Sequence, residues 1–347
     1  MTEATAEPLT PVLPPTSERR RLPVWARTVA VAGIVAAVAV FPHLDLTTGY
    51  RLRFATFLAM WIGLASSWNL IGGYTGYVDF GHAVFYGLGA YNVGMLMVDV
   101  GLPFVIALPV GGLGAAVFAL LIGTPTLRLR GPYFSIAMLG ILVAVREVVR
   151  SLPASITGGG GGLSLPVLEA PSYEAFFYIM AAIAGLVVAV SAGLRRSQFG
   201  LQLAAIREDE LAAGMKGINT AAVKIRIFAL SAFFTGLLGG VSAYWFGYLL
   251  PQQVFLESYT VQMIMMVLLG GLGTLAGPII GAVALYVLQQ TLWANFVDWH
   301  LFSLGVLLVA LVYFLPQGVL GAFGHRGAYS VRRLVGSWFG GGEARSP

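Results

Sequence analysis

Residues 102–127 read LPFVIALPVGGLGAAVFALLIGTPTL, and no charged side chain interrupts them. About 20 apolar residues in a helix cross the hydrocarbon core of a bilayer, so this stretch is long enough to span a membrane by itself. Pro109 and Pro125 lie inside it and interrupt the backbone hydrogen bonding of a helix. A membrane tolerates such interruptions only where neighbouring helices or a water-filled cavity satisfy the freed groups, which favours a transporter or a channel.

Apolar stretches of this kind recur along the whole chain. The others lie at roughly 24–41, 54–71, 80–98, 132–149, 173–194, 226–250, 259–269, 276–294 and 301–315. The composition agrees, because 58% of the 347 residues are hydrophobic and only 10% are charged, whereas soluble domains carry about 25% charged residues. We therefore predict an all-α integral membrane protein, a polytopic bundle of about 8–10 transmembrane helices.

Glycine is abundant, with 45 residues. The pairs Gly236/Gly240, Gly273/Gly277 and Gly277/Gly281 have GxxxG spacing, in which small residues let two membrane helices approach closely. These pairs predict helix-packing faces.

The positive charges predict the orientation in the membrane. With ten spans and a cytoplasmic N-terminus, all but four of the 20 Lys and Arg residues lie on the cytoplasmic side, as the positive-inside rule requires. The four exceptions are Arg51, Arg53, Arg146 and Arg150. We therefore predict a disordered cytoplasmic tail at 1–23, a transmembrane domain at 24–325 and a cytoplasmic tail at 326–347. The net charge of +5 reflects this topology, and we expect no nucleic-acid partner.

The longest polar connection is the cytoplasmic loop 195–225, which begins RRSQFGLQLAAIREDELAAGMKGIN. Leu203, Ile206 and Leu211 recur at near-helical spacing among charged residues, and this predicts one short amphipathic helix. Gly217 is placed to end the helix as the residue after its cap. On the opposite side, five consecutive glycines in 157–163 (TGGGGGL) exclude a stable helix and predict flexible or closely packed backbone.

Several kinds of chemistry are excluded. The chain has no cysteine, and its two lysines, Lys216 and Lys224, do not lie in a GxxxxGK[ST] phosphate loop, so the chain is no P-loop ATPase by itself. Its four histidines are scattered and form no zinc-binding motif, so we expect no metal site.

Asp79 and His82 are ionisable residues at the start of an apolar stretch. Such residues inside a membrane segment are functional-site candidates by default. The alternative is structural, with Asp79 as the N-cap of a helix whose first turn starts at Phe80, and with His82 bonded to a neighbouring helix. The sequence leaves both roles open.

Five motifs occur in order between about residues 55 and 320. They are GGYTGYVDFGHAVFYGLGAY at 72–91, LRGPYF at 129–134, TGGGGGL at 157–163, AIREDELAAGMKGIN at 205–219 and GGLGTLAGP at 270–278. Together they resemble the motifs of branched-chain amino-acid ABC transporter permeases, in particular the LivM type.

The resemblance implies a membrane-spanning permease subunit of an ABC importer, resident in the bacterial cytoplasmic (inner) membrane. It implies transport of branched-chain or related hydrophobic amino acids. The implied partners are two ABC ATPase subunits, a second homologous permease subunit, an extracytoplasmic solute-binding protein and membrane lipids. No cofactor is expected on this chain, because ATP and Mg would bind to the ATPase.

The resemblance also implies site residues. In the coupling loop 195–225, acidic side chains would accept hydrogen bonds from the ATPase and small residues would permit close approach. The coupling residues are Arg207, Glu208, Glu210, Ala212, Ala213 and Gly217. A translocation path would include Asp79, His82, Tyr133, Thr157, Gly158 and Gly159.

Two alternatives to this function remain. One follows from a departure from the family's motif, and the other belongs to a different class of transport protein. Asp79 stands where the family usually has Ser, which leaves a urea or short-chain amide permease open. An ATP-independent secondary carrier or facilitator is the alternative of another class. The coupling-loop pattern and the lack of a clear set of buried ion-coupling charges argue against it. A membrane enzyme ranks last, since no nucleophile with a base is evident.

Overall fold

The computed structural model describes residue 42 and residues 49–166, 172–295 and 305–306. The chain divides into two units, Met1–Leu44 and Asp45–Pro347, and the description below concerns the second. The predicted span 24–41, both predicted tails and nearly all of the predicted span 301–315 lie outside the described residues.

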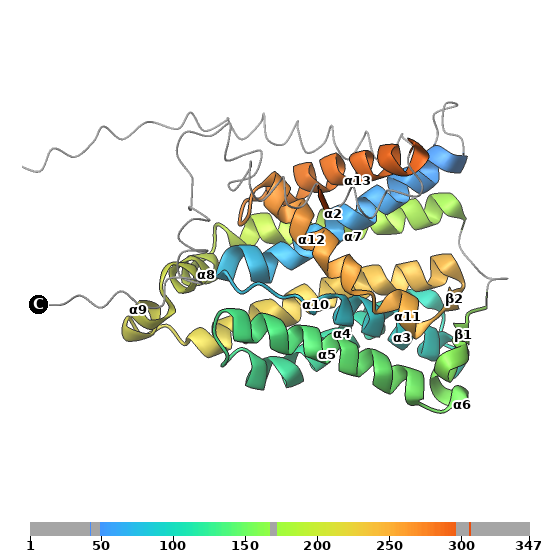
Figure 1. Cartoon of the computed structure of the whole chain (residues 1–347), viewed down its shortest axis with the longest axis horizontal. Coiled ribbons are helices and arrows are strands. Elements are labelled where there is room, and N and C mark those ends of the chain that lie inside the picture. The colour runs from blue at the N-terminus through green and yellow to red at the C-terminus, as the bar shows by residue number, and fades with distance from the viewer. Residues whose placement is uncertain (1–41, 43–48, 167–171, 296–304, 307–347) are drawn as a thin grey trace, which may run out of the picture. The chain divides into compact units, whose positions relative to one another are not determined.

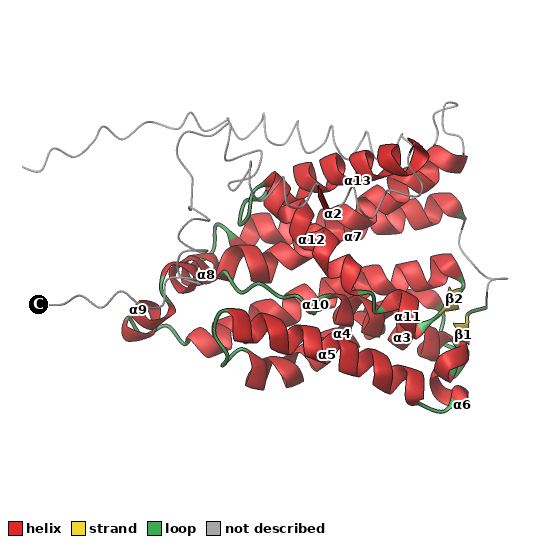
Figure 2. Cartoon of the chain, viewed as in Figure 1, coloured by secondary structure: helices red, strands yellow, loops and turns green. Residues whose placement is uncertain are grey.

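The described part of the second unit is built almost wholly of helices (Figure 2). Most of the long helices lie roughly along one common axis (Figure 1). They are α2 (Gly49–Thr75), α3 (Ala83–Val98), α4 (Phe104–Thr126), α5 (Pro132–Ser151), α7 (Tyr173–Leu194), α10 (Thr220–Phe246), α12 (Glu257–Gly270) and α13 (Gly277–Asn295). Within the described ranges, six segments are long and apolar enough to cross a membrane, namely α2, α4, α5, α7, α10 and the stretch 251–270, which joins α11 (Pro251–Val254) to α12. The helical polytopic prediction is thus confirmed.

Helix α10 is central to the packing, because it lies against α2, α3 and α4. Its glycines permit this: a Cβ atom on Gly236 would meet Ala115 and Gly112 of α4, and one on Gly239 would run into the backbone of Tyr86 in α3. A Cβ on Gly240 would likewise meet Val93 of α3 and Leu108 of α4, so the predicted packing face at Gly236 and Gly240 is confirmed.

The prediction at Gly273 is wrong. This glycine lies in the loop between α12 and α13, with φ at +73°, and its Cα faces the side chain of Arg207. Gly281, by contrast, packs against the backbone of Met266, as a helix-packing glycine does. GxxxG spacing alone does not reveal where a helix ends.

Residues 76–82, the connecting segment, join α2 to α3 without helical structure. Membranes tolerate irregular backbone only where protein buries it, and Tyr77, Asp79, Gly81 and His82 are indeed buried. The predicted N-cap at Asp79 is wrong, because α3 begins at Ala83 with His82 in the cap position. The carboxylate of Asp79 accepts a hydrogen bond from the backbone of Gly81 instead.

At one end of the bundle, α6 (Ala154–Thr157), the 3₁₀ turn η2 (Gly159–Gly161) and two short strands lie together (Figure 1). Strand β1 (Leu163–Ser164) pairs antiparallel with β2 (Tyr248–Leu249). A Cβ on Gly162 would meet the carbonyl oxygen of Leu249. The expected close packing is therefore observed at the two ends of the glycine run, Gly158 and Gly162, whereas Gly160 and Gly161 between them are exposed.

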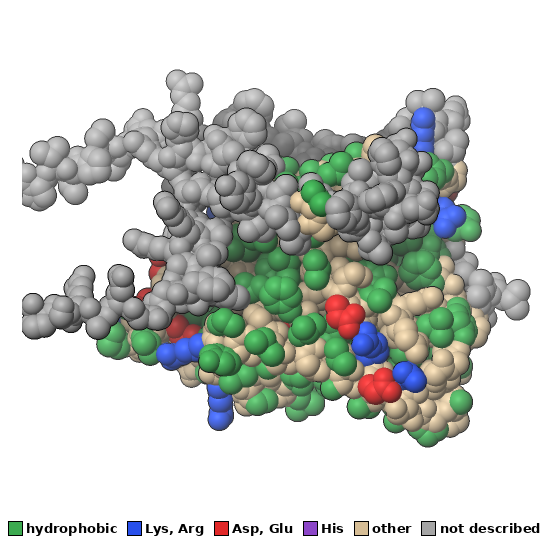
Figure 3. Space-filling view, in the orientation of Figure 1, with side chains coloured by type: hydrophobic (Ala, Val, Ile, Leu, Met, Phe, Trp, Pro, Cys, Tyr) green, Lys and Arg blue, Asp and Glu red, His purple; other side chains and the backbone are tan. Residues whose placement is uncertain are grey.

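The face of the bundle in Figure 3 is covered largely by hydrophobic and uncharged side chains, with charged ones in small groups. On α5, Arg146 forms an ion pair of 2.7 Å with Glu257, and Arg150 lies 3.5 Å from Glu147. A largely uncharged face of this kind is expected on helices that cross a membrane.

The opposite end carries α8 (Gln198–Glu208) and α9 (Glu210–Met215). The prediction of one amphipathic helix is wrong here, because Asp209 adopts an extended backbone and divides the segment. The Asp209 carboxylate caps α9 by accepting hydrogen bonds from the backbone of Leu211 and Ala212. The predicted end at Gly217 is confirmed: Lys216 is the C-cap, and Gly217 follows with φ at +83°.

Candidate functional site

Two clusters of polar side chains lie within this apolar bundle. The first, the buried centre, consists of Ser67, Asp79, His82, Ser231 and Thr235, all fully buried. The second, the α9 anchor, consists of Tyr77, Glu210 and Lys224, which link α9 to the connecting segment and α10.

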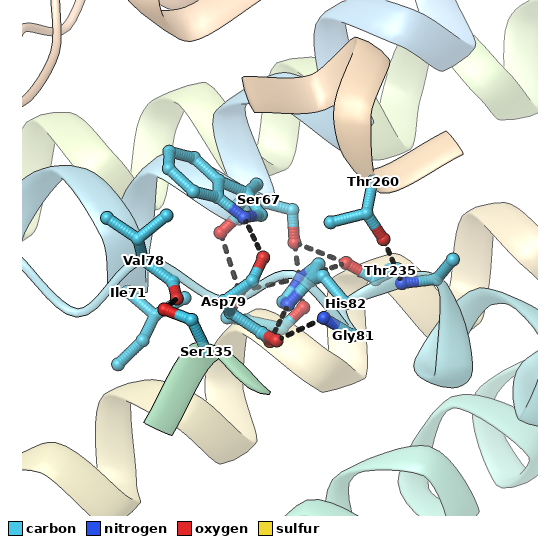
Figure 4. A network of polar contacts seen from close by, with 12 residues as sticks. Ser67, Ile71, Val78, Asp79, Gly81, His82, Ser135, Thr235 and Thr260 are labelled. Atoms are coloured by element: carbon cyan, nitrogen blue, oxygen red, sulfur yellow. Dashed lines mark hydrogen bonds and ion pairs between the residues drawn. The ribbon is translucent and has the colours of Figure 1, made fainter. Parts of the chain in front are cut away.

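The imidazole of His82 is the hub of the buried centre (Figure 4). Its Nδ1 atom lies 2.9 Å from Oδ2 of Asp79. On the other side of the ring, Nε2 lies 2.9 Å from the hydroxyl of Thr235 and 3.2 Å from that of Ser231. The ring therefore joins the connecting segment to α10.

Backbone groups complete the buried centre. Ser67 donates to the carbonyl of Ser231 at 2.7 Å, and Ser231 donates to the carbonyl of Ser67 at 2.6 Å, so the two serines clamp α2 to α10 reciprocally. Trp68 Nε1 donates to the carbonyl of Asp79 at 2.8 Å. His82 is thus bonded to α10, as the structural alternative held, whereas Asp79 caps no helix; the role of both residues in translocation stays a prediction.

The α9 anchor is organised around the ammonium group of Lys224, which is 3% exposed. It donates to Tyr77 Oη at 2.8 Å, to the carbonyl of Leu127 at 2.8 Å and to Glu210 Oε1 at 2.6 Å. Tyr77 Oη in turn donates to the other oxygen of Glu210. An ammonium has three hydrogens, so its donor capacity is matched by these three acceptors.

The charge on Glu210 is stabilised by the same contacts. Burial by itself raises the pKa of this carboxyl. The hydrogen bonds from Lys224 and Tyr77, together with nearby positive charge, outweigh burial and hold the pKa below its ordinary value of 4.5. Glu210 is therefore ionised at neutral pH and balances the buried charge of Lys224.

A further contact holds α8. The Nη1 atom of Arg207 donates to the carbonyl of Gly73 at 2.6 Å, near the end of α2. Close by, the side chain of Asn69 in α2 binds the backbone of Gly273 and Thr274 in the α12–α13 loop. The pair α8–α9 is thus fixed to the bundle on both sides of Asp209.

The predicted coupling residues divide into inward and outward groups. Arg207 and Glu210 bind the chain's own bundle, and Ala213 is buried, so these three do not face outward. Glu208 and Gly217 are exposed and Ala212 is partly buried. Beside them, Leu211 is 61% exposed and Met215 is 84% exposed. The outward face of α9 is therefore apolar, and the exposed acidic side chain of Glu208 lies beside it at the end of α8.

The predicted path residues are not brought together. Tyr133 is exposed in the first turn of α5, whereas the pair Thr157–Gly158 follows its far end, and 20 helical residues extend about 30 Å. Thr157 donates to the carbonyl of Val149 at 2.9 Å and accepts from the backbone of Gly159. The predicted set therefore divides into the pair Asp79–His82, the turn Thr157–Gly159 and the separate Tyr133.

Sequence reasoning missed several residues of both clusters. Lys224 carried a usable signal, since it and Arg226 are the two charges of a largely apolar 27-residue helix and both lie in its second turn. Ser67, Ser231 and Thr235 carried none, because small hydroxyl residues are common in membrane helices and their pairing is 164 or more residues apart. Within the described part of the chain, no three His, Asp or Glu side chains are grouped to hold a metal ion.

Comparison with known proteins identifies the family. Residues 50–312 match the family described as the permease component of the branched-chain amino acid transport system. The high-affinity branched-chain amino acid transport system permease protein LivM of Escherichia coli (strain K12) is 32% identical over 320 residues, which cover 84% of this chain and 74% of the relative. LivH of the same strain, also a permease protein of that system, is 25% identical over 74% of this chain and 90% of its own length.

A third relative is archaeal. The probable branched-chain amino acid transport permease protein LivM of Methanocaldococcus jannaschii is 24% identical over 76% of this chain and 92% of its own length. No solved structure was found to match the chain. From the family match and its six candidate spans, this chain belongs to the membrane-spanning permease components of branched-chain amino acid transport systems.

Proposed function

We propose that this chain is the permease subunit of an ABC importer that translocates branched-chain or related hydrophobic amino acids. In this proposal, an extracytoplasmic solute-binding protein delivers the substrate and two ATPase subunits drive the transport. The relatives support a second homologous permease as partner, because LivM and LivH of one strain are separate permease proteins that both resemble this chain.

The observation that carries the proposal is the pair α8–α9. It lies outside the candidate spans, it is anchored to the bundle at Arg207 and Glu210, and it presents the apolar side chains of Leu211 and Met215 outward. Exposed apolar side chains beside charged ones are typical of interaction sites. We assign α9 and the end of α8 as the docking surface for the ATPase.

The orientation in the inner membrane is part of the proposal. Arg128, Arg130, Arg195 and Arg196 lie in connections at the α8–α9 end, whereas Arg150 lies at the end with the two strands. By the positive-inside rule, the α8–α9 end faces the cytoplasm. With the further spans predicted at 24–41 and 301–315, both chain termini would also be cytoplasmic.

Reconstitution tests the function. The chain is purified with its second permease and the ATPases, placed in proteoliposomes, and supplied with the binding protein and labelled leucine. We expect leucine uptake that requires both ATP and the binding protein. Uptake without ATP would favour a carrier or facilitator, and uptake of urea or acetamide in place of leucine would favour an amide permease.

A further inference from the structure

The connecting segment is held at two points that lie two residues apart. Tyr77 belongs to the α9 anchor, and Asp79 belongs to the buried centre. Between them, the carbonyl of Val78 accepts a hydrogen bond of 2.6 Å from Ser135 of α5. This short segment therefore contacts three helices, namely α9, α10 and α5.

The break at Asp209 makes α9 a separate body. Asp209 has φ −158° and ψ 111°, and α9 is joined to α10 through Gly217, whose φ is +83°. Extended and left-handed backbone at the two ends lets a six-residue helix change direction without bending α8 or α10. What links it most firmly to the bundle is the Glu210 carboxylate.

That link also binds Tyr77. A buried ammonium that loses its carboxylate partner is left as an uncompensated charge, so Glu210 and Lys224 remain paired when α9 shifts. The Tyr77 hydroxyl accepts from Lys224 and donates to Glu210, so it follows the pair. The backbone from Tyr77 to Asp79 then carries the displacement to the hydrogen bonds of His82.

We propose that Tyr77, Glu210 and Lys224 are positioning residues that transmit movement of α9 to the connecting segment and the buried centre. This inference rests on the proposed docking of the ATPase on α9. It assigns Glu210 to a contact within the chain, whereas the resemblance implied a contact with the ATPase. The Glu210–Lys224 ion pair attaches α9 to α10, and the Tyr77 hydroxyl links this pair to the connecting segment.

The test uses Tyr77→Phe in the complete reconstituted transporter. The variant keeps the ring against Phe134, where the ring centroids are 5.4 Å apart, and removes only the hydroxyl. We expect unchanged copurification of the ATPase and a fall of about ten-fold in leucine transported per ATP hydrolysed, the order produced by losing one hydrogen bond to a charged group. Tyr173→Phe is the matched control, because Tyr173 is 65% exposed on α7 and outside both clusters.

A second variant tests whether the link is shared. Glu210→Gln keeps the shape of the side chain and removes its charge, and we expect the same fall in coupling, with the Tyr77→Phe/Glu210→Gln double variant no worse than either single one. Wild-type coupling in Tyr77→Phe would overturn the inference. Loss of ATPase binding by Tyr77→Phe would also overturn it, since the hydroxyl would then serve docking or folding. Failure of the wild-type complex to transport leucine with ATP would instead reject the proposed function.

Discussion

At the scale of single residues, the two clusters satisfy the hydrogen bonding of their buried polar atoms in different ways. In the buried centre, neutral hydroxyls surround the Asp79–His82 pair, and each connects to a backbone carbonyl or a ring nitrogen. In the α9 anchor, one ammonium satisfies three acceptors from three elements. Removing a partner from such a cluster costs more free energy than forming the cluster contributes, because the remaining polar group stays desolvated.

Replacement of Lys224 by Met tests this cost. The variant leaves Glu210 and Tyr77 without their common donor, and we expect the free energy of unfolding to fall by about 3–5 kcal/mol, as for a buried ion pair that loses one partner. The measurement is the thermal stability of the purified permease in detergent. Lys216→Met is the control, since Lys216 is exposed, and equal stability of the two variants would contradict the buried role.

The stability of the α9 anchor should also depend on pH, and it should decrease as the pH falls. The folded pKa of Glu210 lies below 4.5, so its contribution to stability is fully present above the unfolded pKa and is lost as pH falls through the folded pKa. We expect constant resistance of the 195–225 loop to proteolysis from pH 8 to about 5.5, and faster cleavage below about pH 4. A pepsin-like acid protease below pH 5 and trypsin above it provide the measurement. Glu210→Gln should abolish the acid-dependent step, and persistence of the step in that variant would assign it to another group.

At the scale of elements, glycine decides how closely α10 approaches its neighbours. Gly239→Ala would place a Cβ against the backbone of Tyr86, which cannot move as a side-chain tip can. We expect a loss of about 1–3 kcal/mol from this overpacking, seen as a lower melting temperature. Gly185→Ala on α7 is the matched control, because a Cβ there meets nothing within 4 Å, and it should be neutral or stabilising since alanine is the better helix former.

The sequence predicted most helices but not where irregular backbone begins. Hydropathy identified α4 and α10 because their apolar runs are long, and Gly217 was readable as a helix end because a left-handed residue is needed there. The sequence offered an N-cap at Asp79 and none at Asp209, yet Asp209 is the residue that caps a helix, whereas the Asp79 carboxylate binds Gly81 and His82. The hydroxyls of the buried centre meet only through tertiary packing of α2 on α10, which no local pattern encodes.

At the scale of the whole molecule, the described bundle has two chemically different ends. One carries α8 and α9 with their acidic and apolar outward face, and the other carries β1, β2 and the glycine turn. The long helices between them expose mainly apolar side chains. Such a division is expected of a subunit that meets different partners on the two sides of a membrane.

The orientation can be measured cleanly because the chain has no cysteine. Met215→Cys places a single thiol on the exposed face of α9, and Arg150→Cys places one near the opposite end. With a membrane-impermeant maleimide, we expect the first variant to react only in inverted vesicles and the second only in spheroplasts. The reverse pattern would place α9 outside the cell and would exclude its docking to an ATPase.

The contacts of Lys224 have a consequence for biosynthesis. Its three partners, Tyr77, Leu127 and Glu210, all precede it in the chain. All three acceptors have therefore left the ribosome before this lysine does. Pairing of its charge does not require any segment that is synthesised later. Vectorial synthesis thus provides all three acceptors before α10 is complete.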